Sequence, residues 1–322
     1  MAGETIGYRT ENLTAGALLT TAAFFCVALV GTLAKVSGQY TSTGVLLLFQ
    51  NAICLLFVIP VVWRAGWASL RTRKVGLHLL RAGGGTACWW ALFFAITQIP
   101  LANAMLLTYS APLWMPLIAW AVTRRRVAAS TWIGAGVGFV GVMLVLRPQG
   151  HGFSGGELSA FAGALLLAVA MMSVRWLGAT EPVTRILFYY FLLSTLLSIP
   201  IAALDWKPVP AQGWPWLIGL GFAQLSSQIL IVVAYRFASA EKLGPFIYSV
   251  IVFTAVIDWI FWGHAPSLST YLGMALVIGG GLIAVRARPP IAAVDATEQP
   301  RRGRSSRPPA SRPGSRGTGH RS

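Results

Sequence analysis

The sequence contains the same apolar segment twice. When residues 101–147 are set above residues 240–286 without a gap, the second copy lies 139 positions after the first. The alignment pairs polar, aromatic and glycine positions: Tyr109-Ser110 with Tyr248-Ser249, Trp120 with Trp259, Ser130-Thr131 with Ser269-Thr270, Gly134 with Gly273, Gly141 with Gly280, and Arg147 with Arg286. Each copy reads as an apolar helix, a short loop and a second apolar helix. We therefore interpret the segment as a duplicated structural unit.

Composition places this unit in a bilayer. Hydrophobic residues make up 56% of the chain and charged residues only 11%, with a mean hydropathy of +0.67. A soluble domain carries about 25% charged residues, so this chain lacks the polar groups to cover a surface in water. The three cysteines lie in apolar runs without C-x-x-C spacing, and we interpret them as buried hydrophobic residues.

Ten apolar runs approach the roughly 20 residues that a helix needs to cross a bilayer. The expected spans are 13–35, 44–63, 76–99, 101–123 and 131–146, then 157–177, 184–204, 214–237, 244–263 and 268–286. Because five is an odd number, two such halves must cross the membrane in opposite directions. The predicted fold is therefore an all-α integral membrane protein of ten transmembrane helices, arranged as two inverted five-helix repeats over 13–147 and 157–286. Inverted repeats are typical of secondary transporters.

Lysine and arginine collect on alternate connections between these spans. They lie in residues 64–74 and 124–126, around Arg175 and Arg185, in residues 236–242, and in the C-terminal tail. The positive-inside rule therefore predicts that both termini, including residues 1–12, are cytoplasmic.

The tail carries much of the net charge of +16, since eight of the 25 basic residues follow residue 286. Residues 287–322 are rich in Pro, Gly, Ser and Arg, and we expect them to be disordered. Beside a membrane, attraction to anionic lipid headgroups is favoured over binding of nucleic acid.

The chain resembles the drug/metabolite transporter superfamily, specifically its EamA-type ten-helix proteins, over roughly residues 13–286. The resemblance rests on Ile99-Pro100-Leu101-Ala102-Asn103-Ala104, on Leu107-Thr108-Tyr109-Ser110-Ala111-Pro112, on Tyr235-Arg236-Phe237-Ala238-Ser239-Ala240 before Gly244-Pro245, and on the glycine-rich runs 133–146 and 272–285. It implies a ten-helix carrier with a central cavity. A frequent family arginine in the second helix is replaced by Gln50, and the family's Gly-Glu pairs are absent. The substrate and coupling ion of better-known relatives are therefore not assigned to this chain.

The resemblance implies a secondary transporter of small organic metabolites or drugs, working by alternating access in the cytoplasmic membrane. The alternatives are a membrane-embedded enzyme acting on a lipid-linked substrate, and a passive channel. An enzyme would need carboxylates, His or Lys gathered at one membrane face and large loops. The sequence has neither, so we do not expect an enzyme. Its four histidines are scattered, so no metal or cofactor is expected. A homodimer is compatible with the sequence.

Asp258 is the strongest single candidate for chemistry. A carboxylate inside a span costs about 2.5–3.5 kcal/mol and should face a cavity or a partner. It is a candidate for proton coupling or for binding a cationic group, and the alternative is a carboxylate near the external end satisfied by water or Trp262. Lys35 and Arg175 end the first helix of each repeat, where they either hold an anionic substrate or extend to the interface. Arg81 is expected to be a cytoplasmic anchor.

Polar and aromatic residues inside the spans are the candidate substrate site. The polar members are Gln50, Asn51, Asn103, Tyr109, Gln224, Gln228 and Tyr248, and the deeper aromatic members are Trp90, Trp114 and Tyr189. Aromatic faces bind planar or cationic groups. The alternative for the polar side chains is a hydrogen bond across a helix interface.

Two further patterns concern packing. Residues 136–141 match G-x-G-x-x-G, but we exclude a dinucleotide site because the motif lies inside a span and no strand precedes it. Gly134, Gly138, Gly273 and the run 279–281 are instead expected to allow close helix contact. Pro112, Pro116 and Pro245 are expected to kink their helices.

Overall fold

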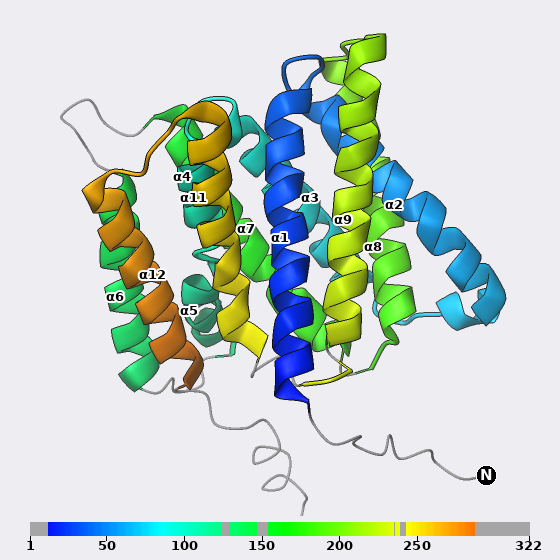
Figure 1. Cartoon of the computed structure of the whole chain (residues 1–322). Helices are drawn as coiled ribbons and strands as arrows, with labels where there is room; N and C mark the ends of the chain where they lie inside the picture. Colours follow the sequence, from blue (N-terminus) through cyan, green and yellow to red (C-terminus); the bar gives the residue numbers. More distant parts are fainter. Residues whose placement is uncertain are drawn as a thin grey trace, which may run out of the picture. The chain divides into compact units, whose positions relative to one another are not determined.

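The structure is a computed structural model, and it describes residues 12–123, 129–146, 154–178, 180–234, 236–238 and 243–286. The predicted basic tail and residues 124–126 lie outside this part of the chain. Every regular element among the described residues is a helix, which confirms the predicted fold class (Figure 1). The helices are α1 (Leu13–Ser37), α2 (Thr43–Ala65), α3 (Val75–Ile96), α4 (Leu101–Thr108), α5 (Ala111–Thr123), α6 (Ala129–Leu146), α7 (Gly155–Gly178), α8 (Val183–Leu204), α9 (Trp214–Ala234), α11 (Ser249–Trp262) and α12 (Leu268–Arg286), with the short 3₁₀ helices η1 (Trp67–Leu70), η2 (Ala211–Gly213) and η3 (Gly244–Tyr248).

Seven of the helical segments in the described part are long and apolar enough to cross a membrane. They are α1, α2, α3, α7, α8, η2 with α9, and η3 with α11. Helices α6 and α12 hold shorter apolar stretches, Trp132–Val145 and Leu268–Ile283. The first described helix begins and the last one ends at the same end of the bundle, as an even number of crossings requires (Figure 1).

The fourth predicted span is not continuous. Helix α4 ends at Thr108 and α5 begins at Ala111, because Pro112 has no N–H to continue the α-helical hydrogen bonds. The ninth span changes from the 3₁₀ helix η3 to α11 between Tyr248 and Ser249. The breaks therefore fall at the matched Tyr-Ser pairs. In each, the serine hydroxyl donates to the carbonyl three residues earlier, Ser110 to Leu107 at 2.6 Å and Ser249 to Phe246 at 2.7 Å.

The two repeats are interleaved rather than side by side. The most extensive helix contacts all join one repeat to the other: α6 with α12, α3 with α7, α1 with α9 and α2 with α8. By their order in the two repeats, α1 is equivalent to α7, α2 to α8, α3 to α9 and α6 to α12. Exchanging the repeats therefore turns the pair α1–α9 into α7–α3 and leaves the pairs α2–α8 and α6–α12 unchanged. Contacts between helices thus follow a pseudo-twofold axis that relates the two repeats, as the duplicated sequence predicts.

Helices α6 and α12 approach through the glycines that the alignment matched. A Cβ atom on Gly141 would lie 2.7 Å from the Gly273 carbonyl oxygen, and one on Gly280 would lie 2.5 Å from the Gly134 carbonyl oxygen. Gly134 is equivalent to Gly273 and Gly141 to Gly280, so the two contacts are related by the pseudo-twofold axis. The expectation of close glycine packing is confirmed for these residues. It is wrong for Gly279, which has open space around its Cβ position.

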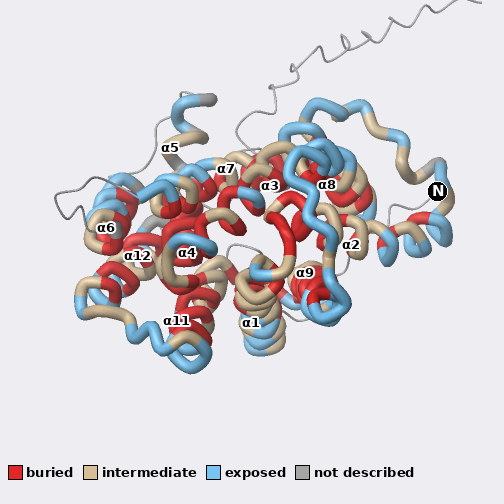
Figure 2. Tube along the Cα trace, turned by 90° about the horizontal axis from the view of Figure 1, so that it is seen from above, coloured by how far each residue is buried: buried red, intermediate tan, exposed pale blue. Residues whose placement is uncertain are grey.

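Buried and exposed side chains are distributed over the helices as expected for a membrane protein. Buried residues lie on the inner faces of the helices, while the outer faces are exposed (Figure 2). Many of the exposed residues are large and apolar, for example Leu18 at 67% and Phe261 at 70% exposure. Such a surface suits lipid and not water. Of the three free cysteines, Cys54 and Cys88 are buried, as expected, whereas Cys26 is half-buried.

We predict that Gly280→Ala destabilises the protein and that Gly279→Ala does not. The added methyl group at Gly280 would meet the backbone of α6, which cannot move aside without separating the helices, at a cost of roughly 1–3 kcal/mol. Thermal unfolding in detergent is the measurement. Equal unfolding temperatures for the two variants would contradict the α6–α12 packing.

Candidate substrate site

Six polar side chains are buried on α2, α3, α8 and α9, four helices that contact one another across the two repeats. We call this group the polar core, and it consists of Gln50 and Asn51 on α2, Thr86 on α3, Ser194 and Ser198 on α8, and Gln224 on α9. None of the six residues is more than 3% exposed. Four helices, two from each repeat, therefore carry buried polar side chains on the faces that pack inside the bundle.

Most of the polar core lacks hydrogen-bond partners within the protein. Both amide groups of Gln50 and Gln224, and the hydroxyls of Thr86 and Ser194, have none. The exceptions are Asn51 and Ser198. Asn51 Nδ2 donates to the Leu47 carbonyl within α2 at 2.9 Å, and it joins α2 to α8 by lying 3.4 Å from Ser198 Oγ. An unpaired buried polar group costs free energy, so these groups call for a partner that the protein does not supply, such as a water molecule or a ligand.

Asp258 is buried at one end of the bundle, and it is bound by residues of the other repeat. Its Oδ1 atom lies 3.1 Å from Lys35 Nζ, and its Oδ2 atom accepts the Ala102 backbone N–H at 3.1 Å. His264 Nδ1 lies 3.2 Å from Oδ1. Lys35 Nζ also lies 4.2 Å from the centroid of the Trp262 ring. Lys35 and Asp258 were predicted as separate candidates, and the structure brings them together. We call the group of Lys35, Ala102, Asp258, Trp262 and His264 the Asp258 cluster.

A small cavity opens beside this cluster. Its volume is about 160 Å³, and Asn103, Asp258 and His264 are among the residues that line it. Asn103 is thus the one predicted substrate-site residue that lies beside the predicted coupling residue.

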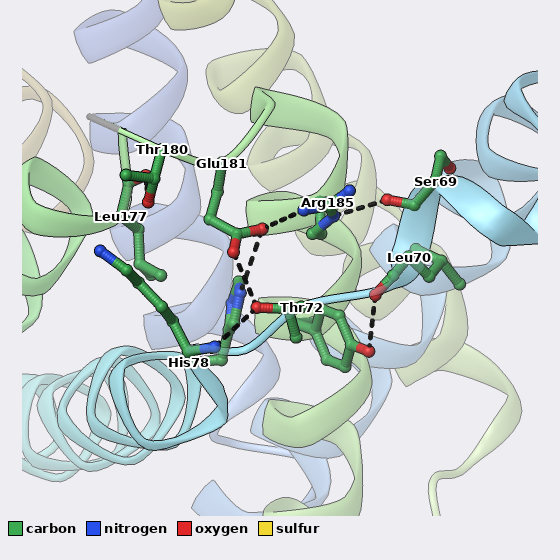
Figure 3. Close-up of polar contacts among 10 residues, drawn as sticks. Ser69, Leu70, Thr72, His78, Leu177, Thr180, Glu181 and Arg185 are labelled. Atoms are coloured by element: carbon green, nitrogen blue, oxygen red, sulfur yellow. Dashed lines mark hydrogen bonds and ion pairs between the residues drawn. The ribbon is translucent and has the colours of Figure 1, made fainter.

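A second ionic group lies at the opposite end of the bundle, where α7 connects to α8 (Figure 1), and Figure 3 shows its contacts. Glu181 lies in the connection between α7 and α8, and its carboxylate accepts Arg185 Nη1 at 2.6 Å and Thr72 Oγ1 at 2.7 Å. Arg185 Nε donates to the Ser69 carbonyl at 2.5 Å, and His78 Nε2 lies 4.0 Å from the carboxylate. We call this the Glu181 cluster. Like the Asp258 cluster, it joins the two repeats.

The Glu181 carboxylate is ionised at neutral pH. Burial alone would raise its pKa, but the hydrogen bonds from Arg185 and Thr72 and the charge of Arg185 outweigh burial and hold the pKa below its ordinary value. A lowered carboxyl pKa contributes stability that is complete above the unfolded-state pKa and is lost as the pH falls through the folded-state value. The cluster therefore persists over the physiological pH range. Sequence analysis overlooked Glu181, although a Glu and an Arg four residues apart at a helix start were a usable signal.

The remaining predicted residues are dispersed. Tyr109 packs edge-on against Phe24, and Tyr248 packs on Gly281. Trp114 donates to Ser110 Oγ at 3.1 Å and lines an apolar cleft of about 230 Å³ between α5 and α6.

Four other predicted residues are not part of the polar core. Tyr189 donates to the Leu70 carbonyl at 3.0 Å and stacks beside His78, which places it at the Glu181 cluster. Trp90 is 39% exposed on the outer face of α3, and Gln228 is half-buried on α9. Arg175 lies on α7, and its side chain is outside the described part of the structure.

Comparison with known proteins gives a consistent result. A model of the EamA-like transporter family matches residues 14–147 and again residues 154–286. The chain is 27% identical to the pseudopaline exporter CntI of Pseudomonas aeruginosa over 83% of this chain and 95% of that protein. It is 29% identical to a riboflavin transporter of Vibrio cholerae, over 80% and 87% of the two chains. It is 22% identical to an S-adenosylmethionine uptake transporter of Rickettsia felis, over 83% and 92%.

A solved crystal structure has the same fold. It superimposes with a TM-score of 0.59 at 20% identity and covers 89% of this chain and 99% of its own.

We predict strong coupling between Lys35 and Asp258. Replacing one partner of a buried ion pair leaves the other charge unpaired, which costs roughly 3–5 kcal/mol. Lys35→Met and Asp258→Asn should each lower the unfolding temperature, and the double variant should lose much less than the sum. A double-mutant cycle measured by unfolding in detergent checks this. Additive losses would show that the two side chains do not interact.

Proposed function

The chain belongs to the EamA-like transporter family and is a multi-pass membrane transporter, and we propose that it is a secondary carrier working by alternating access between its two repeats. It moves a small polar metabolite across the cytoplasmic membrane. Its relatives are named for pseudopaline, riboflavin and S-adenosylmethionine, all of which are small polar organic molecules, and this supports the proposed substrate class.

The main observation that supports this proposal is the polar core. Its glutamines, Gln50 and Gln224, are fully buried and have no protein partner. They lie on helices from different repeats, so movement of one repeat against the other changes the space between them. Substrate sites in carriers with inverted repeats lie near the midplane at the interface of the repeats. The unpaired amides are the groups that would hydrogen-bond a polar substrate there.

The two ionic clusters support alternating access. The Asp258 cluster joins α11 to α1 and α4, and the Glu181 cluster joins the start of α8 to the connection between α2 and α3. They lie at opposite ends of the bundle, with the polar core between them. Opening one end requires one cluster to break while the other holds. We propose that these clusters are the two gates.

The charges of the connections support one orientation. Arg71, Arg73, Lys74 and Arg185 lie at the end of the bundle that holds the Glu181 cluster. The positive-inside rule favours placing this end in the cytoplasm. The Asp258 cluster then faces the exterior.

We predict that Gln224→Leu lowers transport severely without lowering stability. The leucine fills a similar volume and removes an unpaired buried amide, which is worth roughly 1–3 kcal/mol to the folded state. Initial uptake is measured in proteoliposomes, first with riboflavin, S-adenosylmethionine and pseudopaline as probes. Thermal unfolding in detergent is measured in parallel.

The matched control is Ser226→Ala, because Ser226 is exposed on the same helix. It should transport as the wild type does. A Gln224→Leu variant with full transport, or one that unfolds at a clearly lower temperature, would refute the role proposed for the polar core.

We also propose that Asp258 couples transport to protons. Protonation removes the charge that binds Lys35 and so releases α1 from α11. Asp258→Asn should abolish the dependence of transport on external pH. An unchanged pH profile in properly inserted protein would remove this role from Asp258.

A further inference from the structure

Arg81 does not act as the surface anchor that the sequence suggested. It lies six residues after the start of α3, roughly 9 Å along the helix axis. Its guanidinium carbon lies 4.1 Å from the centroid of the Tyr190 ring on α8, and Tyr190 is only 1% exposed. The side chain therefore turns inward, between the two repeats, and not toward the lipid headgroups.

No carboxylate of the described residues neutralises Arg81. The four acidic residues there are Glu157, Glu181, Asp205 and Asp258. Glu181 is paired with Arg185, Asp258 is paired with Lys35, and Glu157 binds Ser154 at the start of α7. Asp205 follows the far end of α8 from Tyr190. The buried Nε atom of Arg81 also has no hydrogen-bond partner in the protein.

Arg81 is half-buried, and a cation inside a span without a carboxylate beside it calls for an explanation. A charged side chain inside a span costs about 2.5–3.5 kcal/mol and is retained chiefly on pathways for substrates and ions. Lys35 and Arg185, which lie nearer the helix ends, each have a carboxylate to offset that cost. Arg81 has the aromatic face of Tyr190, which stabilises a guanidinium but leaves its N–H donors available.

The backbone makes room for this arrangement at Gly85. A Cβ atom there would lie 2.7 Å from Tyr190 Cε2 and 3.1 Å from Arg81 Nη1. Gly83 on the same helix has open space at the equivalent point. The close approach of α3 to the Arg81–Tyr190 pair therefore depends on one glycine in particular.

The pair lies on a polar route into the protein. His78, a member of the Glu181 cluster, lies one helical turn before Arg81 on α3. On α8, Ser194 follows Tyr190 by one turn on the same face, and its buried hydroxyl has no partner. Ser198 follows by another turn and hydrogen-bonds Asn51. Arg81 thus lies between the Glu181 cluster and the polar core.

We propose that Arg81 binds a carboxylate of the transported substrate and so selects organic acids or zwitterions. The inference rests on the carrier function proposed above. The guanidinium supplies one positive charge and paired N–H donors, which match a singly charged carboxylate. Binding neutralises the cation, so the loaded site carries no uncompensated charge into the bilayer. An amide of the same shape supplies no charge and leaves the guanidinium unpaired.

The test uses matched pairs of ligands. Purified full-length protein is titrated with a set of aromatic, heteroaromatic and aliphatic carboxylic acids, each beside its own primary amide, and ligand binding is read as a rise in unfolding temperature. We expect stabilisation by at least one acid, with its amide weaker by roughly tenfold to a hundredfold, the range for a hydrogen bond to a charged group. A screen in which no acid is preferred over its amide would overturn the proposal.

Variants connect the preference to Arg81. Arg81→Gln should bind the acid and the amide with equal, weak affinity, while Arg81→Lys should keep part of the preference. Gly85→Ala should lose the preference because its methyl group displaces the pair, and Gly83→Ala should keep it. The ligand-free Arg81→Gln protein should unfold at the wild-type temperature or above, because a half-buried charge without a carboxylate partner is removed. A lower temperature, with the acid preference unchanged, would show a purely structural role.

Proteoliposome uptake separates this inference from the carrier function. Uptake of only neutral or cationic probes would support the carrier function and refute the carboxylate site. Binding of acids through Arg81 without uptake of any probe would support the carboxylate site and contradict the proposed carrier function.

Discussion

A buried carboxylate must be neutralised and hydrogen-bonded, and the two most buried carboxylates of the described residues both take hydrogen bonds from the opposite repeat. Asp258 of the second repeat takes Lys35 and the Ala102 N–H from the first. Glu181, also of the second repeat, takes Thr72 from the first, and its partner Arg185 binds the Ser69 carbonyl. Because desolvation makes a lone charge costly, these contacts hold the repeats together at both ends. The same contacts are the ones that opening at either end must break.

The helix packing follows the pseudo-twofold axis, but the polar contacts at equivalent positions differ between the two repeats. Thr41 donates to the Lys207 carbonyl at 2.7 Å, joining the connection after α1 to the connection after α8. Its equivalent is Thr72 with Glu181, which joins the connection after α2 to the connection after α7. One version is a neutral hydrogen bond and the other belongs to an ionic cluster. The duplicated helices thus provide the common scaffold, and single-residue differences between the copies give the two ends different polar contacts.

Much of the fold could be predicted from the sequence because it depends on properties of single segments. Apolar length located the helices to within a few residues, and the matched Gly134, Gly141, Gly273 and Gly280 marked the helix pair that packs across the axis. The site was harder to predict because it depends on where side chains from distant segments point. Lys35 and Asp258 are 223 residues apart, and nothing in either span indicated their pairing. Arg81 near a helix end resembled an anchor, and only its position over Tyr190 shows that it turns inward.

The polar core holds buried polar groups that have no partner in the protein, and we propose that these groups bind the substrate. Accessibility of Ser194→Cys, in protein whose three native cysteines are replaced by alanine, tests this most directly. Ser194 is fully buried between the two ionic clusters. A membrane-impermeant maleimide is applied to each face of reconstituted membranes in turn. Alternating access predicts labelling from both faces, with Asp258→Asn favouring one and Glu181→Gln the other. Labelling from neither face, or from one face whichever cluster is broken, would contradict it.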